Sequence, residues 1–345
     1  MRSQRLFIGG TVTGGKIMKY VRLGNTGLKV SRLCLGCMTY GDPSKGNHSW
    51  VLREDESMPF FKEAWEAGIN FFDTADMYSL GASEEVTGRA LKKLGARDTQ
   101  VIATKVYNPM SKDPNDRGLS RKHIMKSIDG SLKRLGTDHV DLYQIHRFDY
   151  HTPIEETMEA LHDCVKAGKV RYLGASSMWA RQFIQMQHVA ERNGWTRFVS
   201  MQNFYNAVYR EEEREMIPFC QETGVGLIPW SPMGRGFLTR RHTDRTIGDT
   251  ARATSDPVAA RVFGREEDFA VADAVGGVAD ARGVPMAQVA LAFVLAHPAI
   301  TAPIIGASKP GHFPDALKAL ELELSEAELD SIRAAYRPNE TKGHQ

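Results

Sequence analysis

Long apolar runs are absent from this 345-residue chain. No segment approaches the roughly 18 consecutive apolar residues of a membrane-spanning helix, so we expect no membrane partner. An excess of charge of either sign is also missing, because 44 Lys and Arg residues face 42 Asp and Glu residues and the formal net charge is +2. No basic stripe stands out, which argues against nucleic acid as a partner. The composition, 42% hydrophobic and 25% charged, is that of an ordinary globular protein.

Cysteine is scarce, and its four positions form no disulfide pattern, so we expect a protein of the reducing cytoplasm. Cys34 and Cys37 make a CxxC pair, but no second pair accompanies them. Their odd spacing within the strand-like run SRLCLGCM sends the two side chains to opposite faces of the strand. We therefore interpret both as core cysteines and predict no metal site.

The first 17 residues, MRSQRLFIGGTVTGGKI, lack the sustained apolar stretch of a signal peptide. Their glycines are followed neither by GK[ST] nor by a helix, which argues against a phosphate-binding loop. We expect residues 1–17 to be a loose extension, 18–338 to form a single domain and 339–345 to be a loose tail.

From residue 20 onward, strand-like and helix-like segments alternate with short connections. After a hairpin over 20–22 and 28–30, the expected strands are 33–37, 70–74, 101–106, 140–145, 171–174, 198–202, 225–229 and 300–306. These strands do not alternate apolar and polar residues, as expected of parallel strands that are buried on both faces. Glycines in EAGIN, KAGKV and ETGVG stand where a helix must stop before the next strand.

Eight strand-then-helix units in this order predict an α/β fold. We expect a (β/α)8 TIM barrel with an N-terminal hairpin, two extra helices and a long loop, 239–265, after strand 7. The alternative, an open doubly wound sheet, normally carries GxGxxG after its first strand, and LGCMTYGD lacks it. In such barrels the active site lies at the C-terminal ends of the strands.

Four polar residues stand at the ends of three of these strands: Asp73, Tyr78, Lys105 and His146. Reduction of a carbonyl by hydride creates an alkoxide that must be protonated, and a tyrosine with a pKa of about 10 needs help to act as the acid. A lysine beside the phenol favours the phenolate, an aspartate keeps the lysine charged, and a histidine orients the substrate oxygen. Singly, Asp73 is explained as a turn cap, Tyr78 as a loop aromatic and His146 as a core histidine. Their joint position on consecutive strands favours catalysis.

Seven runs of sequence carry a resemblance to a known family: GINFFDTADMYS, ATKV, DLYQIH, GKVRYLGASS, QNFYN, PWSPMGRGFL and PIIGASKP. In their order along residues 18–337 they resemble the aldo-keto reductases. LGCMTYGDP and IHRFDY make the chain most similar to bacterial members, in branches that resemble 1-deoxyxylulose-5-phosphate synthase-like and aryl-alcohol-dehydrogenase-like proteins. The resemblance implies that Tyr78 is the general acid/base, and that NADPH is the hydride donor, bound extended without a Rossmann domain.

The resemblance also implies which residues hold the cofactor. The residues expected at the nicotinamide are Ser176, Ser177 and Gln202, with Trp230 stacked on the ring. The residues expected along the pyrophosphate are Ser231, Met233, Gly234 and Gly236. The residues expected around the adenosine 2′-phosphate are Gly306, Ser308, Lys309 and His312. The charge of Lys309 favours NADP(H) over NAD(H).

Aromatic and charged residues near the strand ends are expected to line the substrate mouth, namely Tyr40, Tyr107, Arg147 and Trp179. The predicted function is NADP(H)-dependent reduction of an aldehyde or ketone to an alcohol, with a small-molecule carbonyl or alcohol as the partner. Two alternatives stay open. One is a cofactor-sensing module, since the potassium-channel β subunits share this fold, and the other is a sugar epimerase or isomerase that uses bound cofactor transiently. The composition does not indicate an oligomeric state.

Overall fold

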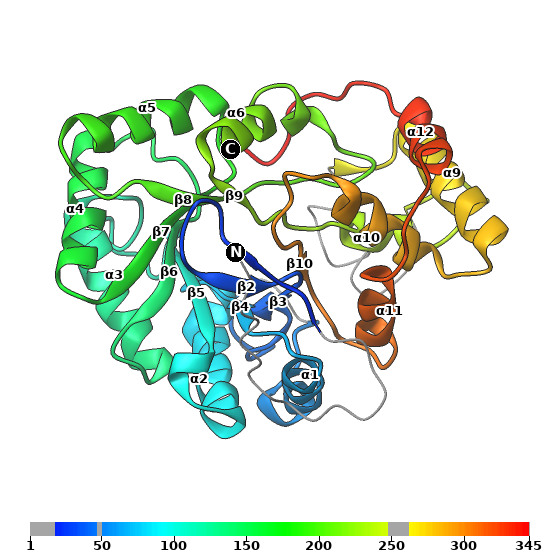
Figure 1. Cartoon of the computed structure of the whole chain (residues 1–345). Helices are drawn as coiled ribbons and strands as arrows, with labels where there is room; N and C mark the ends of the chain where they lie inside the picture. The colour runs from blue at the N-terminus through cyan, green and yellow to red at the C-terminus, as the bar shows by residue number, and fades with distance from the viewer. Residues whose placement is uncertain (1–17, 47–49, 248–261, 345) are drawn as a thin grey trace, which may run out of the picture.

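The computed structural model describes residues 18–46, 50–247 and 262–344. A ring of parallel strands occupies its centre, and helices surround the ring (Figure 1). The predicted extension, 1–17, lies outside the described residues, as does the greater part of the predicted long loop, since 248–261 are not described.

The central sheet of the described chain has eight parallel strands in the order β10-β3-β4-β5-β6-β7-β8-β9. They are β3 (Cys34–Gly36), β4 (Phe71–Asp73), β5 (Val101–Val106), β6 (Val140–Ile145), β7 (Val170–Ser176), β8 (Phe198–Gln202), β9 (Gly226–Leu227) and β10 (Ile304–Ile305). Leu227 forms a parallel bridge with Ile300, and its carbonyl accepts a hydrogen bond from the N–H of Thr301. The N–H of Ile304 donates to the carbonyl of Pro229. These bonds join β9 to β10, the two strands at the ends of the sheet order, and so close the sheet into a barrel. The predicted (β/α)8 barrel is confirmed.

Helices follow the strands and cover the outside of the barrel (Figure 1). They are α1 (Glu54–Glu66), α2 (Ala82–Leu94), α3 (Arg121–Leu135), α4 (Ile154–Lys166), α5 (Ala180–Arg192), α6 (Met216–Thr223), α10 (Met286–Ala296) and α11 (His312–Ala319). Two further helices, α9 (Glu266–Arg282) and α12 (Glu326–Ala335), pack against each other as additions to the repeat. A 3-10 turn, η4 (Glu211–Glu213), precedes α6.

An antiparallel hairpin, β1 (Tyr20–Arg22) and β2 (Lys29–Ser31), crosses one end of the barrel (Figure 1). Leu23 and Val30 from this hairpin have no exposed surface and belong to one apolar cluster with Phe71, Leu142 and Ile228 from the strands. Apolar side chains therefore fill this end of the barrel. Any site for a ligand must lie at the other end, where the C-terminal ends of the strands meet.

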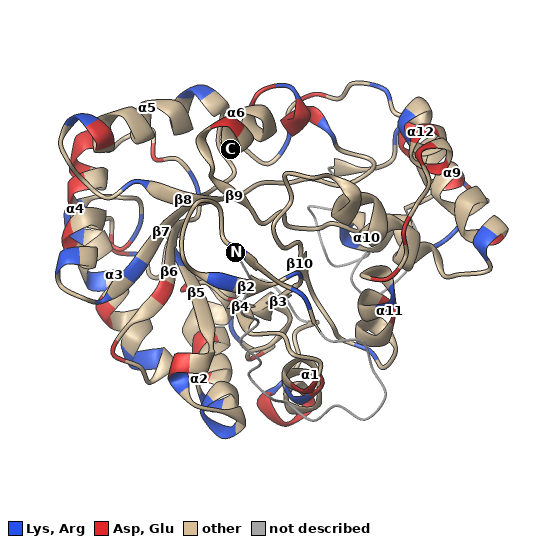
Figure 2. Ribbon diagram, in the orientation of Figure 1, with Lys and Arg blue, Asp and Glu red and all other residues tan. Residues whose placement is uncertain are grey.

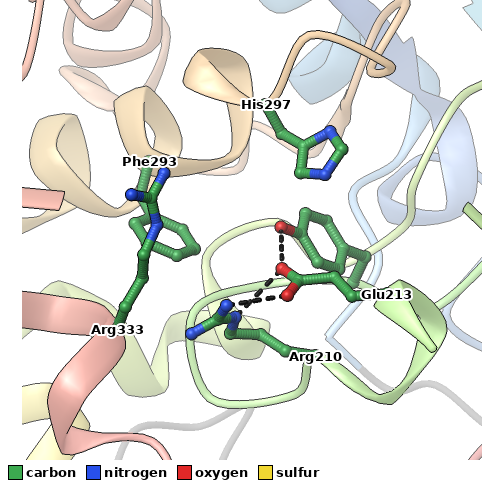
Figure 3. A pocket seen from close by; sticks show the side chains of 6 residues that line it. Arg210, Glu213, Phe293, His297 and Arg333 are labelled. Atoms are coloured by element: carbon green, nitrogen blue, oxygen red, sulfur yellow. Dashed lines mark hydrogen bonds and ion pairs between the residues drawn. The ribbon is translucent and has the colours of Figure 1, made fainter. Parts of the chain in front are cut away.

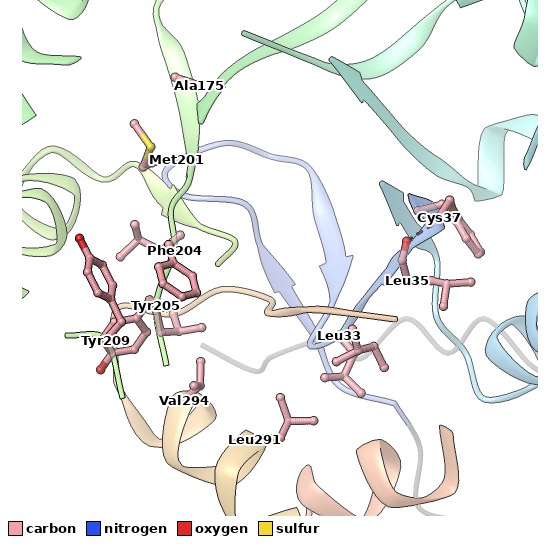
Figure 4. Close-up of a cluster of buried hydrophobic side chains, with 14 of the residues drawn as sticks. Leu33, Leu35, Cys37, Ala175, Met201, Phe204, Tyr205, Tyr209, Leu291 and Val294 are labelled. Carbon is pink, nitrogen blue, oxygen red and sulfur yellow. Dashed lines mark hydrogen bonds between the residues drawn. The ribbon is translucent and has the colours of Figure 1, made fainter. Parts of the chain in front are cut away.

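A larger apolar cluster lies between the strands and the helices, and Figure 4 shows part of it. Cys37 belongs to this outer cluster, whereas Cys34 belongs to the cluster inside the barrel. The two cysteines thus face opposite sides of β3, as their spacing predicts. Burial raises the pKa of the Cys37 thiol to about 12, so this cysteine is a packing residue and not a nucleophile.

The C-terminal segment 339–344 differs from the loose tail that the sequence predicts. The Asn339 N–H donates to Glu211 (2.6 Å), and the Lys342 N–H donates to the Tyr209 hydroxyl (2.9 Å). His344 is buried and pairs with Glu212 at 2.8 Å. The tail is held by polar contacts to residues 209–212, and such non-local pairing leaves no apolar pattern in the sequence.

Charges of both signs are interspersed on the outer helices, whereas the strands carry few (Figure 2). Across the described ranges, no single helix is both long and apolar enough to span a membrane. Helices α9 and α10 reach that length and composition only together, with a bend of 106° between them. The same ranges contain no group of three or more His, Cys, Asp or Glu residues arranged to hold a metal ion.

Candidate active site

The four residues singled out at the strand ends come together at one end of the barrel, and we call them the tetrad. Asp73 is the last residue of β4, Lys105 lies in β5, and His146 directly follows β6. Tyr78 begins a 3-10 turn, η2 (Tyr78–Gly81), after β4. Asp73, Lys105 and His146 are all buried at this end of the barrel.

The Lys105 ammonium connects the tetrad. Its Nζ donates to Asp73 Oδ2 (2.5 Å), to the Thr74 carbonyl (2.8 Å) and to the Tyr78 hydroxyl (3.3 Å). It also lies 4.9 Å from the centre of the Tyr78 ring. An ammonium has three N–H groups, so each of them has an acceptor although Lys105 has no exposed surface. Burial alone would lower the pKa of Lys105, but Asp73 and Tyr78 reverse this effect and raise its pKa.

Tyr78 stays protonated in this environment. Burial raises its pKa above the ordinary value, and Asp73 adds to the increase, while Lys105 acts in the opposite direction. From the sequence we expect Lys105 to lower the pKa of Tyr78, but burial raises this pKa by more than Lys105 lowers it. Tyr78 therefore holds a proton at neutral pH, and Lys105 contacts the oxygen from which that proton must leave.

His146 is uncharged. Burial lowers its pKa well below the usual range, and Lys105 and Arg147 lower it further. Its Nδ1 lies 3.2 Å from the amide nitrogen of Asn108. An amide nitrogen can only donate, so Nδ1 is the acceptor and the proton of the neutral ring resides on Nε2. The His146 ring meets the Tyr78 ring edge-on, with centroids 5.7 Å apart.

Buried acidic residues hold the loop that carries Tyr78 and the helix that follows it. Asp76 has no exposed surface and accepts a hydrogen bond from the Ser127 hydroxyl (2.9 Å). Burial, with Glu84 nearby, raises the pKa of Asp76 to about 8. Glu84 is itself buried and pairs with Arg134 at 2.6 Å. The loop is thus tied to α3 through Asp76 and Ser127, and the helix α2 that follows it is tied to α3 through Glu84 and Arg134.

Two glutamine side chains supply further hydrogen bonds to the Asp73 carboxylate. Gln144 of β6 and Gln202 of β8 each donate to Asp73 Oδ1 at 2.9 Å. The Gln202 amide nitrogen also lies 3.1 Å from Gln144 Oε1. The sequence predicts Gln202 at the nicotinamide but does not single out Gln144 or Asn108. Gln144 stands two residues before His146, and strand alternation would have indicated that it faces the barrel interior.

The residues expected at the nicotinamide lie together around Gln202. The Ser176 hydroxyl donates to the Gln202 carbonyl (2.8 Å) and lies 3.1 Å from the Ser177 hydroxyl. The indole N–H of Trp230 donates to the Ser177 hydroxyl (3.0 Å). One face of Trp230 stacks on Phe204, with centroids 4.3 Å apart. Serine at position 177, with φ of 50°, thus serves as an acceptor for the indole.

The residues expected at the phosphates fall on two neighbouring turns. Ser231 and Gly234 have left-handed backbone, with φ of 53° and 59°, and Gly236 lies in the 3-10 turn η5 (Gly234–Thr239), which Met233 precedes. The second group consists of Gly306, Ser308, Lys309 and His312, at the start of α11. There the Ser308 N–H lies 3.4 Å from His312 Nδ1, and Lys309 is exposed. An exposed lysine at the positive end of a helix suits a phosphate group.

The residues expected at the substrate divide into two groups. Tyr40 has no exposed surface, and its ring packs 4.8 Å from that of Phe61, so its position in the core does not support substrate contact. Tyr107 and Arg147 are partly buried, and Trp179 is 43% exposed. The Trp179 ring meets His344 of the C-terminal tail edge-on, at 4.8 Å between centroids.

A cavity of about 180 Å³ lies between η4, α10 and α12 (Figure 3). Its lining residues are Tyr205, Arg210, Glu213, Phe293, His297 and Arg333, and none belongs to the tetrad. Arg210 donates twice to Glu213, at 2.9 and 2.7 Å, and the Tyr205 hydroxyl donates to the same carboxylate. Arg333 pairs with Asp330 at 2.9 Å. These charges already neutralise one another.

Comparisons with known proteins agree with this geometry. A model described as the aldo/keto reductase family matches residues 32–337. The chain is 45% identical over 342 residues to a versiconal hemiacetal acetate reductase of Aspergillus parasiticus, covering 93% of this chain and 98% of that protein. It is 44% identical over 352 residues to a putative aryl-alcohol dehydrogenase of Schizosaccharomyces pombe, covering 94% and 97%.

A putative aryl-alcohol dehydrogenase of Saccharomyces cerevisiae is 41% identical over 345 residues, covering 93% of this chain and 98% of that protein. The three relatives named here are fungal proteins, so the expected similarity to bacterial members is not supported. The expected similarity to aryl-alcohol dehydrogenases is confirmed, because two of the three carry that description.

Proposed function

The chain belongs to the aldo/keto reductase family of NAD(P)-dependent oxidoreductases, and within it we propose that this protein reduces an aldehyde or ketone with NADPH, with Tyr78 as the proton donor. The observation that carries the proposal is the Lys105 ammonium, which lies 2.5 Å from Asp73 and 3.3 Å from the Tyr78 hydroxyl. A neutral phenol beside a fixed cation is the arrangement that a proton donor to an alkoxide needs.

In the proposed reaction, negative charge develops on the carbonyl oxygen of the substrate and is quenched by the proton of Tyr78. The phenolate that remains is stabilised by Lys105, whose charge Asp73 maintains. His146 keeps its proton on Nε2, since Asn108 engages Nδ1, and it therefore offers one N–H to the same substrate oxygen. Because His146 is neutral, it orients the oxygen without competing as an acid.

The residues present fit a dinucleotide. Ser176, Ser177 and Gln202 supply hydroxyl and amide groups beside the indole of Trp230, which suits a carboxamide on an aromatic ring. When bound there, the nicotinamide supplies the hydride. The exposed Lys309 at the start of α11 supplies positive charge for a 2′-phosphate, which supports NADPH over NADH.

An aromatic carbonyl is the substrate class that we favour. Two of the relatives named above are described as putative aryl-alcohol dehydrogenases. Trp179 is exposed, and Tyr107 is partly so, which leaves aromatic surface available for an aromatic ring. Arg147 donates to the carbonyl of His146 and places a positive charge next to the tetrad.

NADPH oxidation at 340 nm with 4-nitrobenzaldehyde tests the proposal. We expect turnover by the wild type and a loss of at least about 100-fold in kcat for Tyr78→Phe, with NADPH affinity nearly unchanged, because only the proton donor is removed. Tyr20→Phe is the matched control, since Tyr20 lies in the hairpin at the other end of the barrel. There its hydroxyl donates to the carbonyl of Gly68. Retention of most of the wild-type rate by Tyr78→Phe would contradict the assignment.

Other outcomes separate the alternative functions. Tight NADPH binding without oxidation across a broad panel of carbonyls would indicate a cofactor-sensing module. Conversion of a sugar without net change in absorbance at 340 nm would indicate an epimerase or isomerase.

A further inference from the structure

The Asp73 carboxylate receives hydrogen bonds from three different strands. Lys105 of β5 occupies Oδ2, and Gln144 of β6 and Gln202 of β8 share Oδ1 at 2.9 Å each. All four residues are at least 97% buried. Within the described residues, Oδ1 therefore depends on two amide groups, of which Gln202 is also the expected partner of the nicotinamide.

Both hydrogens of the Gln202 amide are used in this arrangement. The Gln202 amide nitrogen carries two hydrogens, and its two acceptors are Asp73 Oδ1 and Gln144 Oε1. If Gln202 turns to a nicotinamide carboxamide, it gives up one or both of these bonds. Gln144 then remains as the amide donor to Asp73 Oδ1. A buried carboxylate that loses its donors is costly, so the presence of Gln144 decides how easily Gln202 can turn.

The barrel is built to admit the Gln144 side chain. Gln144 pairs in register with Lys105 on one side and with Gly174 on the other. A Cβ at Gly174 would lie 2.9 Å from Gln144 Cγ and 2.5 Å from the Ser200 hydroxyl, closer than real contacts allow. Glycine at 174 thus provides the space in which Gln144 reaches across to Asp73.

We propose that Gln144 is a positioning residue that holds the Asp73 carboxylate when Gln202 turns to the nicotinamide, so that cofactor binding leaves the Lys105–Tyr78 contact in place. The inference rests on the proposed function only in assigning Gln202 to the cofactor. It adds a coupling between two glutamines that should appear in the binding of NADPH itself.

A double-mutant cycle on NADPH binding tests this coupling. In Gln144→Met, Gln202 is the last amide donor to Asp73 Oδ1, so turning it to the cofactor leaves the carboxylate short of a donor. We expect the Kd for NADPH, measured by quenching of tryptophan fluorescence, to rise about 10-fold or more. Gln202→Met has no amide at position 202 that must turn to the cofactor. In this background we expect the addition of Gln144→Met to change the Kd for NADPH less than about 2-fold.

Gln187→Met is the matched control. Gln187 of α5 is also a buried glutamine with two amide hydrogen bonds, which join it to the backbone of Phe198 at 2.9 Å each. It does not contact the tetrad in the described structure, so Gln187→Met should lower the thermal midpoint as Gln144→Met does but leave the Kd unchanged. If Gln144→Met does not fold, Gln144→Asn, which keeps the amide but is too short to reach Asp73, takes its place in the cycle.

Equal effects of the Gln144 substitution in both backgrounds, or no effect in either, would overturn the inference. Such a result would leave the proposed function standing, provided that the wild type binds NADPH and reduces carbonyls. Failure of the wild type to bind NADPH would instead contradict the proposed function, and with it the role of Gln202 on which the coupling depends.

Discussion

At the residue scale, the chemistry depends on how a lysine without exposed surface stays charged. Lys105 has an acceptor for each of its hydrogens, and Asp73 and Tyr78 together outweigh the effect of burial on its pKa. Its pKa in the folded protein is raised, so the stability that it contributes is complete below the pKa of a free lysine, about 10.4, and is lost only as pH rises through the higher folded value. The pair is therefore intact throughout the neutral range.

We expect a single residue, Lys309, to decide the choice of cofactor. We expect Lys309→Ala to weaken NADPH binding about 10-fold, because a charge-assisted contact to the 2′-phosphate is lost, and to leave NADH binding nearly unchanged. Parallel titrations of both cofactors give the result. Lys318→Ala, an exposed lysine at the other end of α11, should affect neither cofactor. Equal losses of NADPH and NADH affinity in Lys309→Ala would refute the assignment.

Asp76 links pH to stability. Its pKa of about 8 means that the folded protein keeps the carboxyl protonated while the unfolded chain ionises it near pH 4. The free energy of unfolding should therefore fall between about pH 4 and pH 8, by on the order of 1 kcal/mol per pH unit.

Asparagine mimics the protonated carboxyl without titrating. We expect the stability advantage of Asp76→Asn over the wild type to grow from pH 5 to pH 8 in urea unfolding. Asp129→Asn, at an exposed carboxylate that pairs with Lys169 on the surface, should leave the shape of the pH curve unchanged. An advantage of Asp76→Asn that does not depend on pH would show that Asp76 is not held protonated.

Single residues differ in how well the sequence predicts them. Asp73, Lys105 and His146 were predictable because strand ends in a barrel converge, and Tyr78 because it follows Asp73 at a short interval. Gln144 and Asn108 were not, since each acts through another side chain and carries no motif of its own. Tyr40 was placed in the mouth because it follows a strand, but Phe60 and Phe61 of α1 cover it in the core.

At the scale of elements, the close approach of two helices depends on one glycine. Gly88 lies in α2, where an added Cβ would stand 2.1 Å from the carbonyl oxygen of Leu135 in α3. We expect Gly88→Ala to destabilise the protein by about 1–3 kcal/mol or more, because the two helices must move apart. Gly277→Ala in α9 should instead be neutral or stabilise by up to about 1 kcal/mol, since nothing lies within 4 Å of its added Cβ. Similar urea midpoints for the two variants would contradict this packing.

The elements themselves follow from local sequence where the signal is strong. The bounds of β5 and β6 agree with the predicted strands, because four of the six residues in each are apolar and mark a buried strand clearly. The strands β9 and β10 contain only two residues each, although longer segments were expected. Their pairing is completed by bridges and single hydrogen bonds, which depend on tertiary contacts and not on local pattern.

At the scale of the whole molecule, the repeating order of strand and helix was sufficient to predict the closed barrel. The docking of the C-terminal tail was not predictable, because it depends on Glu211 and Glu212 meeting backbone and side-chain groups that lie more than 100 residues away in the sequence. The two ends of the barrel have different contents. Its far end is filled by the hairpin, and its near end holds the tetrad beside the groups expected at the nicotinamide.

We propose that this barrel moves a hydride from NADPH to a carbonyl carbon and a proton from Tyr78 to its oxygen. The most direct test follows deuterium from NADPH dideuterated at C4 into the product of an aromatic aldehyde, by mass spectrometry and NMR. We predict an alcohol with one deuterium on the former carbonyl carbon for each NADPH oxidised, and no such product from Tyr78→Phe. An alcohol without deuterium, or labelled product formed equally well by Tyr78→Phe, would contradict the account.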